Sequence, residues 1–372
     1  MSRVALVHDW LTGLRGGERV LEQLCLLYPD ADVYTLVHIK GASGPIIERH
    51  RITSSFLQRL PFAQTRYRSY LPLFPLAIEA LDLSGHDLVI STSHAVAKGC
   101  RPARGALHVS YIHTPMRYVW DQFDAYFGPG RAGLATRAAA HLFAPALRRW
   151  DVASTARANG LVANSNFVAD RCRRLWGREV NAVVYPPVDV ERFRPAEKRD
   201  QVSDQALIVS ALVPYKLVDL AVRAFNRARR KLVVAGSGPE LSRLRALAGP
   251  TVELRGAVSG EELEQLYQRA SFFLLPGEED FGIAPVEAQA AGRPVLALGR
   301  GGALETVVAG QTGVFFSEPT EEALIAALPE IDQLARDQDP LVIRRHAEQF
   351  AVPRFGVELR AAIDAVAGRT RP

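Results

Sequence analysis

The sequence predicts an α/β protein with two domains, each built on a parallel β-sheet covered by helices. Three observations lead to this prediction. Short apolar runs alternate with amphipathic segments in both halves of the chain, as in parallel strands joined by helices. Two adjacent prolines in Tyr185-Pro-Pro-Val-Asp189 force an extended linker between the halves. The 372 residues are long for one domain and sufficient for two.

The strands and helices follow from local composition. Strand-like runs in the first half cover residues 4–7, 33–36, 88–91, 107–112 and 161–163, with helix-like segments such as 18–27 between them. Runs in the second half cover residues 206–212, 231–235, 252–254, 271–275, 294–298 and 313–316, separated by amphipathic pieces such as 240–247 and 261–267. A last helix is expected near residues 353–368. The predicted domains are therefore residues 1–187 and 188–352, followed by a C-terminal segment, 353–372.

Composition favours a protein of the cytoplasm. The apolar run at residues 4–7 is too short for a signal peptide, and no apolar stretch reaches the ~18 residues that span a bilayer. Cys25, Cys100 and Cys172 are few, odd in number and scattered. This pattern favours buried thiols in a reducing compartment over disulfides or a zinc site.

Positive charge is concentrated in the first half of the chain. Residues 1–187 contain 22 Lys and Arg against 14 Asp and Glu, whereas the remaining residues contain 23 against 26. The stretch 49–78 has no acid and places Arg59, Arg66 and Arg68 among aromatic residues. Such a surface fits single-stranded nucleic acid or a membrane interface. We favour an anionic membrane, which attracts each nearby cation by ~1 kcal/mol; the alternative is a solvated basic face over ordinary core aromatics.

The segment 276–294 contains the strongest chemical signal. Its sequence, PGEEDFGIAPVEAQAAGRP, follows a strand-like run and separates Glu279 from Glu287 by seven residues. Gly282 lies in a loop before a predicted helix, and Pro285 suits the first turn of that helix. We expect Glu287 in the same turn, where backbone N–H groups attract a diphosphate. Carboxylates only accept hydrogen bonds, so the two glutamates suit the hydroxyls of a ribose and a sugar.

Glu-x7-Glu followed by Ala-Gln-Ala-Ala-Gly-Arg-Pro resembles the signature of retaining glycosyltransferases of group 1, or family 4, which are related to glycogen synthase. Further motifs occur in the family's order: Val7-His-Asp-Trp-Leu11 with Gly16-Gly17-Glu18, Ile112-His-Thr-Pro-Met-Arg117, Val213-Pro-Tyr-Lys216 and Gly301-Gly302-x-x-Glu305. The resemblance extends over nearly the whole chain and is strongest to bacterial enzymes, often mannosyltransferases, that build surface polysaccharides. It implies the GT-B fold, in which two Rossmann-like domains face each other across a cleft and ligands bind at the carboxyl ends of the strands.

The resemblance implies that the second half binds the donor. Glu279 matches the family glutamate that contacts the donor sugar near the reacting carbon, and Glu287 matches the glutamate that holds the ribose hydroxyls. Lys216 matches the lysine on the donor diphosphate, where its cation offsets the charge of the leaving group. The other expected donor-binding residues are Gly236, Gly238, Arg255, Phe281, Gly282, Ile283 and Arg300. The alternatives are a surface lysine and glutamates that only complement a helix dipole.

One residue departs from the family pattern. The family usually has an arginine five residues before the lysine, and this chain has Ala211 there. Arg300 is a candidate replacement for that arginine in a diphosphate clamp. Without a replacement, the departure implies slower catalysis or an altered activity.

The first half is expected to contribute a glycine loop and a histidine. Gly16 and Gly17 lie on the predicted loop between the first strand and the first helix, where backbone can approach a phosphate or sugar, including that of the donor. His113 matches a family histidine that faces the reacting centre, and a neutral imidazole there would hydrogen-bond hydroxyls. The alternatives are a tight turn and a structural histidine. His8 and Asp9, at the tip of the first strand, are weaker candidates.

We expect no essential metal and no cofactor. Asp30-Ala31-Asp32 resembles a metal-binding triplet but precedes the second strand, at the amino end of the sheet. Asp337-Gln338-Asp339 has the composition of a solvated helix end. Lys216, helix dipoles and loop amides would offset the charge of the diphosphate instead.

The sequence thus predicts a retaining, metal-independent glycosyltransferase that moves a hexose, mannose favoured, from a nucleotide sugar. GDP-mannose is the first candidate donor and a UDP-hexose the second. The expected acceptor is a polyprenyl-linked saccharide at the cytoplasmic face of the membrane, bound by the first domain, and no nucleic-acid partner is expected. Alternatives are a UDP-hexose-dependent transferase with a soluble acceptor, a non-catalytic GT-B scaffold, and an epimerase or phosphorylase on the same fold.

Overall fold

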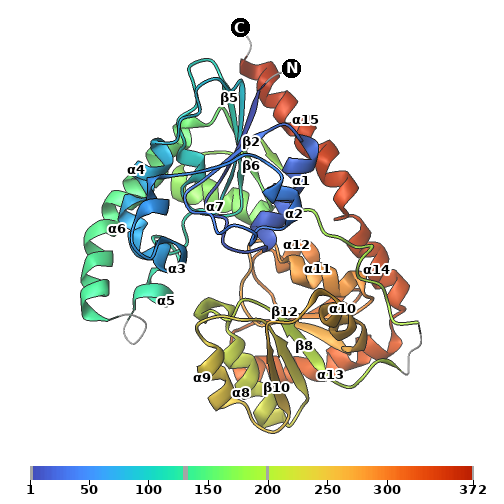
Figure 1. Cartoon of the computed structure of the whole chain (residues 1–372). Coiled ribbons are helices and arrows are strands. Elements are labelled where there is room, and N and C mark those ends of the chain that lie inside the picture. Colours follow the sequence, from blue (N-terminus) through green and yellow to red (C-terminus); the bar gives the residue numbers. More distant parts are fainter. Residues whose placement is uncertain (1–2, 129–132, 198–200, 371–372) are drawn as a thin grey trace. The chain divides into compact units, whose positions relative to one another are not determined.

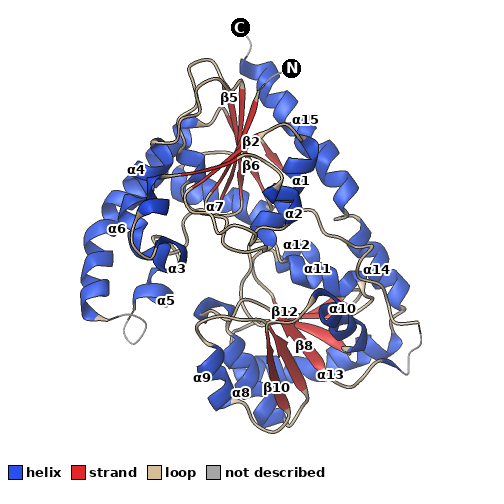
Figure 2. Cartoon of the chain, viewed as in Figure 1, coloured by secondary structure: helices blue, strands red, loops and turns tan. Residues whose placement is uncertain are grey.

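The computed structural model describes residues 3–128, 133–197 and 201–370 (Figure 1). The chain divides into two compact units, residues 1–187 with 355–372 and residues 188–354. Each unit contains one sheet with helices on both of its faces (Figure 2). This is the α/β architecture with two parallel-sheet domains that the alternation of runs predicts.

The sheet of the first unit has the order β3-β2-β1-β4-β5-β6-β7, and every neighbouring pair is parallel. Its strands are β1 (Val4–His8), β2 (Asp32–Thr35), β3 (Ile52–Ser54), β4 (Leu88–Ser93), β5 (Leu107–Ile112), β6 (Gly160–Ala163) and β7 (Ala182–Val183). Its helices are α1 (Gly16–Leu27), α2 (Pro45–Glu48), α3 (Ala63–Arg66), α4 (Phe74–Glu79), α5 (Phe123–Phe127), α6 (Leu134–Ser154), α7 (Asn166–Trp176) and most of α15 (Val352–Thr370). Short 3₁₀ turns lie at Phe56–Arg59, Tyr67–Leu73, Ala97–Gly99 and Thr155–Arg157.

Both faces of this sheet are apolar because both are covered by helices. Along β1, Leu6 packs in one cluster with side chains of α1 and α15, whereas Ala5 and Val7 belong to a second cluster that includes Phe74 of α4 and Leu147 of α6. The C-terminal helix therefore completes the core of the first unit.

The sheet of the second unit has the order β10-β9-β8-β11-β12-β13 and is also parallel throughout. Its strands are β8 (Ala206–Val209), β9 (Leu232–Ala235), β10 (Val252–Gly256), β11 (Phe272–Leu275), β12 (Val295–Leu298) and β13 (Gly313–Phe316). Its helices are α8 (Val218–Ala228), α9 (Leu241–Leu247), α10 (Gly260–Arg269), α11 (Ile283–Ala290), α12 (Ala303–Thr306), α13 (Glu321–Asp337) and α14 (Pro340–Glu348), with a 3₁₀ turn at Pro214–Lys216.

The strand order of each sheet reverses at one place. In the first sheet the reversal lies between β1 and β4, and in the second it lies between β8 and β11. In open parallel sheets the loops that leave the carboxyl ends of such strands diverge to opposite faces and leave a crevice for ligands. The segments after these four strands are therefore where a site is expected in each unit.

The structure tests three further expectations. Cys25, Cys100 and Cys172 are free and buried, and burial raises the pKa of each thiol to about 12. Among the described residues no helix is long and apolar enough to cross a bilayer. The strand expected at 206–212 is shorter, because the chain turns away after Val209 toward the Pro214–Lys216 turn.

Candidate functional site

A close contact between two loops of the second unit brings Lys216 to Glu279. The loop after β8 forms the Pro214–Lys216 turn, and the loop after β11 passes directly over it at Gly277. A Cβ atom on Gly277 would lie 2.8 Å from the Tyr215 carbonyl oxygen and 2.9 Å from that of Lys216. Only glycine fits at this distance, so Gly277 permits the two strand-end loops to pack together.

Lys216 and Glu279 form an ion pair at this junction. The Lys216 ammonium donates a hydrogen bond to Oε1 of Glu279, and the two side chains are 14% and 16% exposed. The backbone of Glu279 is fixed as well, since its carbonyl oxygen accepts from the Gly302 N–H at 2.8 Å. A Cβ on Gly301 would lie 2.5 Å from the same oxygen, so the glycine pair of the Gly301-Gly302 motif is needed for close approach.

Glu287 lies in the second turn of α11, not in the first turn as the sequence predicted. The helix begins at Ile283, directly after Gly282, whose backbone is left-handed with φ of 92°, so Glu287 is its fifth residue. Oε2 of Glu287 accepts a 2.8 Å hydrogen bond from the Tyr267 hydroxyl. Burial, together with Glu287, raises the pKa of Tyr267 well above its usual value, so this hydroxyl remains a donor and orients the carboxylate.

The start of α11 provides the backbone amides that the sequence predicts. Gly282 precedes the helix, Ile283 is its first residue, and Pro285 lies in its first turn. Phe281 differs from expectation, because its ring is 2% exposed and stacks edge-on against Phe350 at 5.4 Å between centroids. The ring is thus a core residue that anchors the loop.

The contacts of the other predicted donor-binding residues, where described, are with residues other than Lys216. Arg300 pairs with Glu318 at 2.7 Å, and Arg255 pairs with Glu253 at 2.6 Å. Gly236 and Gly238 follow β9, and a Cβ on them would lie 1.8 and 2.3 Å from the carbonyl oxygens of Ser210 and Leu212. Both positions therefore require glycine for close packing against this backbone, whether or not they bind a donor. Ala211 lies exposed between these two contacts.

The first unit has its own polar group after β1, β4 and β5. Gly16 and Gly17 are the first two residues of α1, not loop residues as predicted, and Arg15 is the N-cap. A Cβ on Gly17 would lie 3.5 Å from Cε1 of His8 and 3.6 Å from Nε2 of His113. The structure thus brings the glycine pair and His113 together, with His8 beside them.

Asp9 and His94 complete this group. The Asp9 carboxylate is fully buried and accepts four backbone hydrogen bonds, of 2.7–2.9 Å, from residues 94–97. It also contacts Nδ1 of His94 at 3.1 Å. Asp9 therefore fixes the turn after β4. His94 was not predicted because no motif contains it; only its position directly after a strand marks it.

Burial keeps these histidines neutral. Desolvation lowers the pKa of His8, His94 and His113 to about 3 in each case, with the neighbouring Arg68, Arg117 and Arg15 contributing to the shift of His94. A neutral imidazole can donate a hydrogen bond to a hydroxyl or accept one from it, but it has no positive charge that would attract a phosphate.

The aspartate triplets make structural contacts where described. Asp32 begins β2 and accepts a 3.0 Å hydrogen bond from His86, which places it at the amino end of the strand, as predicted. Asp337 ends α13, and Asp339 caps α14 through the Leu341 N–H. Across the described ranges, no three His, Cys, Asp or Glu side chains form a group able to hold a metal.

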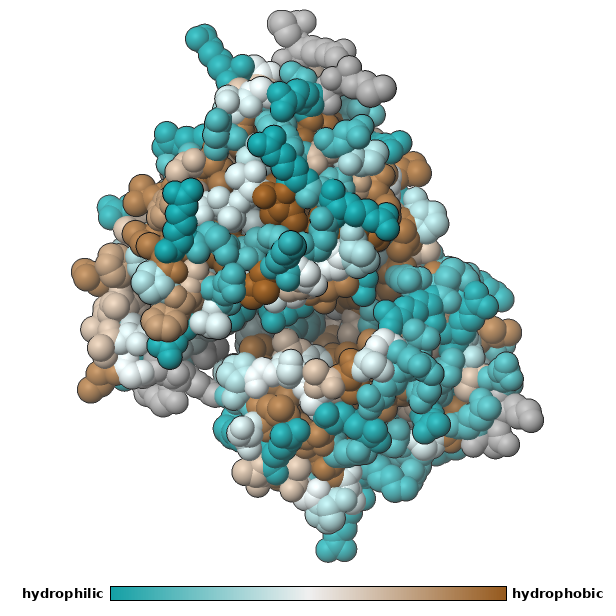
Figure 3. Space-filling model, in the orientation of Figure 1, coloured by the Kyte–Doolittle hydropathy of each residue, from teal (hydrophilic) through white to brown (hydrophobic). Residues whose placement is uncertain are grey.

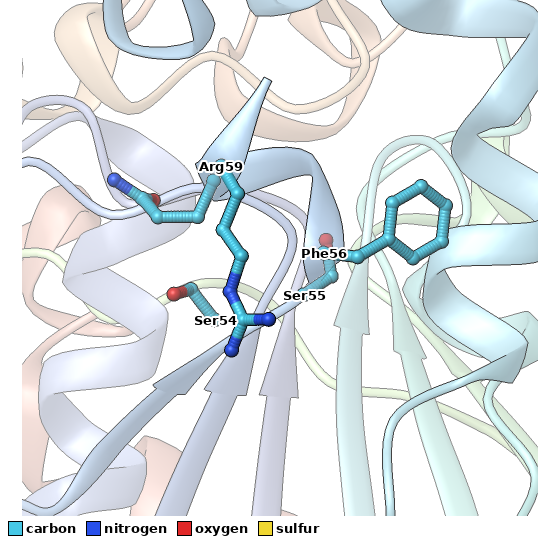
Figure 4. A pocket seen from close by; sticks show the side chains of 5 residues that line it. Ser54, Ser55, Phe56 and Arg59 are labelled. Atoms are coloured by element: carbon cyan, nitrogen blue, oxygen red, sulfur yellow. The ribbon is translucent and has the colours of Figure 1, made fainter.

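The predicted acceptor or membrane residues are exposed on the segment after β3. Arg66 lies 5.5 Å from the centre of the Phe62 ring, and Arg68 lies 4.9 Å from that of Tyr67. Arg59 helps to line a cavity of about 210 Å³ together with Ser54, Ser55, Phe56 and Gln58. In Figure 4 the Arg59 side chain extends over Ser54, whereas the Phe56 ring points to the other side.

Two parallel sheets, each with polar residues where its strand order reverses, define the class of two-domain Rossmann-like proteins. The model of Glycosyltransferase Family 4 matches residues 14–192, and the model of Glycosyl transferases group 1 matches residues 189–345. The chain belongs to the GT-B glycosyltransferases that these two models describe.

Similar proteins agree with this assignment. A D-inositol 3-phosphate glycosyltransferase of Streptomyces avermitilis is 36% identical over 52% of this chain and 49% of its own length. A GDP-mannose-dependent alpha-(1-6)-phosphatidylinositol monomannoside mannosyltransferase of Mycobacterium tuberculosis is 32% identical over 45% of this chain and 51% of its own. The chain thus spans about half the length of these curated relatives. Anabaena HepE, solved with UDP and glucose, shares the fold with a TM-score of 0.70 at 18% identity over 98% of this chain and 100% of HepE.

Proposed function

We propose that the chain is a retaining, metal-independent glycosyltransferase. It moves a hexose, mannose favoured, from a nucleotide sugar to a saccharide acceptor in the synthesis of a surface polysaccharide. The observation that carries the proposal is the Lys216–Glu279 pair beside the start of α11, at the strand-order reversal of the second sheet. A cation, a set of helix amides and two carboxylates together suit a diphosphate that joins a ribose to a sugar.

Each group has a role that its chemistry allows. An ammonium has three N–H donors, so Lys216 can hold Glu279 and still donate to diphosphate oxygens as negative charge grows on the leaving group. Glu279, held by Gly302, would position the donor sugar. Glu287, oriented by Tyr267, would accept from the ribose hydroxyls. The amides at the start of α11 would face the diphosphate.

The relatives indicate two candidate donors that differ in their base. GDP-mannose is favoured, because the mycobacterial relative is described as GDP-mannose-dependent, and a UDP-hexose is second, because HepE was solved with UDP. Thermal melting of the protein with GDP and with UDP tests this choice. At a ligand concentration of 100 Kd the favoured nucleotide should stabilise the fold by ~2.7 kcal/mol. An equal shift with both nucleotides, or a larger shift with UDP, would overturn the preference for GDP-mannose.

The two glutamates should fail differently when each is changed to glutamine. Glu287→Gln weakens ribose contacts that exist in the ground state and the transition state alike, so it should mainly raise the donor KM. Glu279→Gln acts at the reacting sugar and should lower kcat while nucleotide binding persists. Steady-state kinetics and nucleotide titrations separate the two effects. An equal loss of nucleotide affinity in both variants would contradict these roles.

We further propose that the first unit takes a polyprenyl-linked acceptor at an anionic membrane face. Beside Arg59, Arg66 and Arg68, the segment after β3 exposes Phe62 at 70% and Leu76 at 61%. Helix α6 exposes further large apolar residues, among them Leu134 at 80% and Leu142 at 73%. Figure 3 shows hydrophobic residues gathered on this side of the unit, where Figure 1 labels α5 and α6. Exposed apolar residues beside arginines suit the interface of an anionic bilayer.

Changing Arg59, Arg66 and Arg68 together to glutamine should weaken binding to anionic vesicles by up to ~3 kcal/mol. Co-sedimentation with anionic and neutral vesicles at low and high salt measures the effect, and salt should weaken the wild-type binding by screening. The matched control changes Arg194, Arg227 and Arg243, which are 67%, 58% and 49% exposed in the second unit and remove the same charge. Equal loss in both triple variants, or no vesicle binding by the wild type, would show that the basic segment is only a solvated surface.

A further inference from the structure

The cluster of polar residues at the ends of β1, β4 and β5 includes a buried ring nitrogen that has no hydrogen-bond partner. His8 is fully buried, and its Nδ1 is tied to the Thr92 hydroxyl at 2.6 Å. Its Nε2 has no hydrogen-bond partner. A buried polar atom without a partner is costly, and native proteins rarely keep one unless a ligand or water completes it.

Glu18 places a carboxylate opposite this nitrogen. The residue is 5% exposed on the first turn of α1, and its Oε2 accepts from the Arg15 N–H at 3.0 Å. Its Oε1 lies 4.0 Å from Nε2 of His8. That distance is too long for a direct hydrogen bond, but one oxygen atom placed between them can bond to both.

Gly17 lies next to both His8 and His113. Nε2 of His113 is also buried without a partner and lies 3.6 Å from the position of a Cβ on Gly17. The start of a twelve-residue helix, two unpartnered imidazole nitrogens and one carboxylate oxygen therefore surround the same small volume. The glycine keeps this volume free of a side chain.

We propose that His8 and Glu18 bind one hydroxyl group of the sugar substrate, beside Gly17 and His113. The proposal rests on the proposed transfer function and adds two binding residues to it. In this site the Thr92 hydroxyl would donate to Nδ1 of His8, and the ring proton would then be on Nε2. The substrate oxygen then accepts from Nε2–H and donates its own proton to Oε1 of Glu18, which satisfies both buried groups at once.

This arrangement requires the ionised form of Glu18. Burial raises the pKa of Glu18 from 4.5 to about 7, and Asp9 adds to the rise, while backbone hydrogen bonds and Arg15 oppose it. The histidines of the same cluster, His8 at the end of β1, His94 after β4 and His113 after β5, are neutral. The carboxylate acceptor is therefore lost as the pH falls through about 7, and kcat/KM should fall with it.

Glu18→Gln separates this role from a structural one. Glutamine can still accept from the Arg15 N–H, as in an ordinary capping box, so a purely structural role predicts nearly unchanged activity. Because folding raises the pKa of Glu18, the ionisation of this buried carboxylate lowers the stability of the fold as the pH rises from 4.5 to about 7. The glutamine variant does not ionise, so it should melt no lower than the wild type at pH 8. If the carboxylate binds substrate, kcat/KM at pH 8 should drop roughly 10- to 150-fold, and the acid limb near pH 7 should disappear.

Glu22→Gln is the matched control. Glu22 is 4% exposed on the same helix and pairs with Arg19 at 2.8 Å. Glu22→Gln removes a carboxylate that is as buried as that of Glu18 but lies outside the cluster of His8, His94 and His113. It should leave the pH profile of kcat/KM unchanged. Wild-type activity in Glu18→Gln, or an identical loss in Glu22→Gln, would overturn the proposal.

The hydroxyl can belong to the donor sugar or to the acceptor, and the kinetics distinguish them. If it belongs to the donor, Glu18→Gln also slows donor hydrolysis without acceptor. If it belongs to the acceptor, hydrolysis is unchanged and only transfer suffers.

A binding experiment keeps the inference independent of turnover. The imidazole nitrogen signals of His8 and His113 are followed while methyl α-mannoside and, separately, myo-inositol are added. Movement of the His8 signal in the wild type and not in Glu18→Gln supports the hydroxyl site even if no transfer is found, which would count against the proposed function alone. Unmoved signals with both sugars, together with an unchanged pH profile in Glu18→Gln, would show that only a buried water bridges the pair.

Discussion

Lys216→Ala should lower kcat/KM for the donor by roughly 10- to 150-fold, the equivalent of one charge-assisted hydrogen bond of ~1.5–3 kcal/mol. The ammonium is largely shielded from solvent, and Glu279 already orients it. It therefore meets the diphosphate with little reorganisation, and its attraction grows as the glycosidic bond breaks. The effect should appear mainly in kcat. Glu279→Gln combined with Lys216→Ala should be less than additive, because the two side chains act as a pair.

The control for this change is Lys231→Ala, which removes a lysine of the same unit that is 63% exposed and pairs with Asp204. It should leave the kinetics unchanged. Retention of activity within about threefold in Lys216→Ala would mean that the lysine is not a diphosphate ligand, since a charge-assisted bond exceeds that factor. Ala211→Arg restores the residue usual in the family and should hold or raise activity; a loss would indicate a rebuilt pocket.

Lys98→Met should destabilise the first unit by about 3–5 kcal/mol, the usual effect of removing one partner of a buried ion pair. Lys98 is 1% exposed and donates to Oδ1 of the fully buried Asp151 at 2.5 Å. Oδ2 of Asp151 accepts from the indole N–H groups of Trp120 and Trp176 at 2.8 and 2.7 Å. Without the lysine, this carboxylate stays buried with two neutral donors and no countercharge.

Urea unfolding followed by tryptophan fluorescence measures this loss. All four tryptophans lie in the first unit, so their emission reports on that unit. Lys231→Met is the control: its ion pair with Asp204 is exposed, and such pairs contribute ~1 kcal/mol or less. A shift below about 1 kcal/mol in Lys98→Met would indicate that Asp151 becomes protonated or hydrated at little cost.

Sequence patterns predicted the sheets well where strands are buried on both faces. The runs at 107–112 and 313–316 match the bounds of β5 and β13, in which all residues but one are buried. The edge strands β3 and β7 were missed. With three and two residues and partly exposed side chains, Ile52–Ser54 and Ala182–Val183 lack an apolar run that marks them.

The site was predictable only where a motif fixes it. The Glu-x7-Glu spacing identified the segment that carries Glu279 and Glu287, but their partners lie far away in sequence. Tyr267 is 20 residues from Glu287, and Lys216 is 63 residues from Glu279, so only strand order brings them together. His94 and Glu18 show the same limit, since burial and orientation, not residue type, set them apart from other histidines and glutamates.

The most direct test is an assay of nucleotide release from GDP-mannose and from UDP-hexoses, with a polyprenyl-linked saccharide acceptor, with and without EDTA. A retaining, metal-independent glycosyltransferase should release nucleoside diphosphate from one donor, form a bond with the donor's anomeric configuration, ignore the chelator, and lose turnover in Glu279→Gln. Release from no donor, although a nucleotide still stabilises the protein, would contradict catalysis and leave a non-catalytic scaffold on this fold.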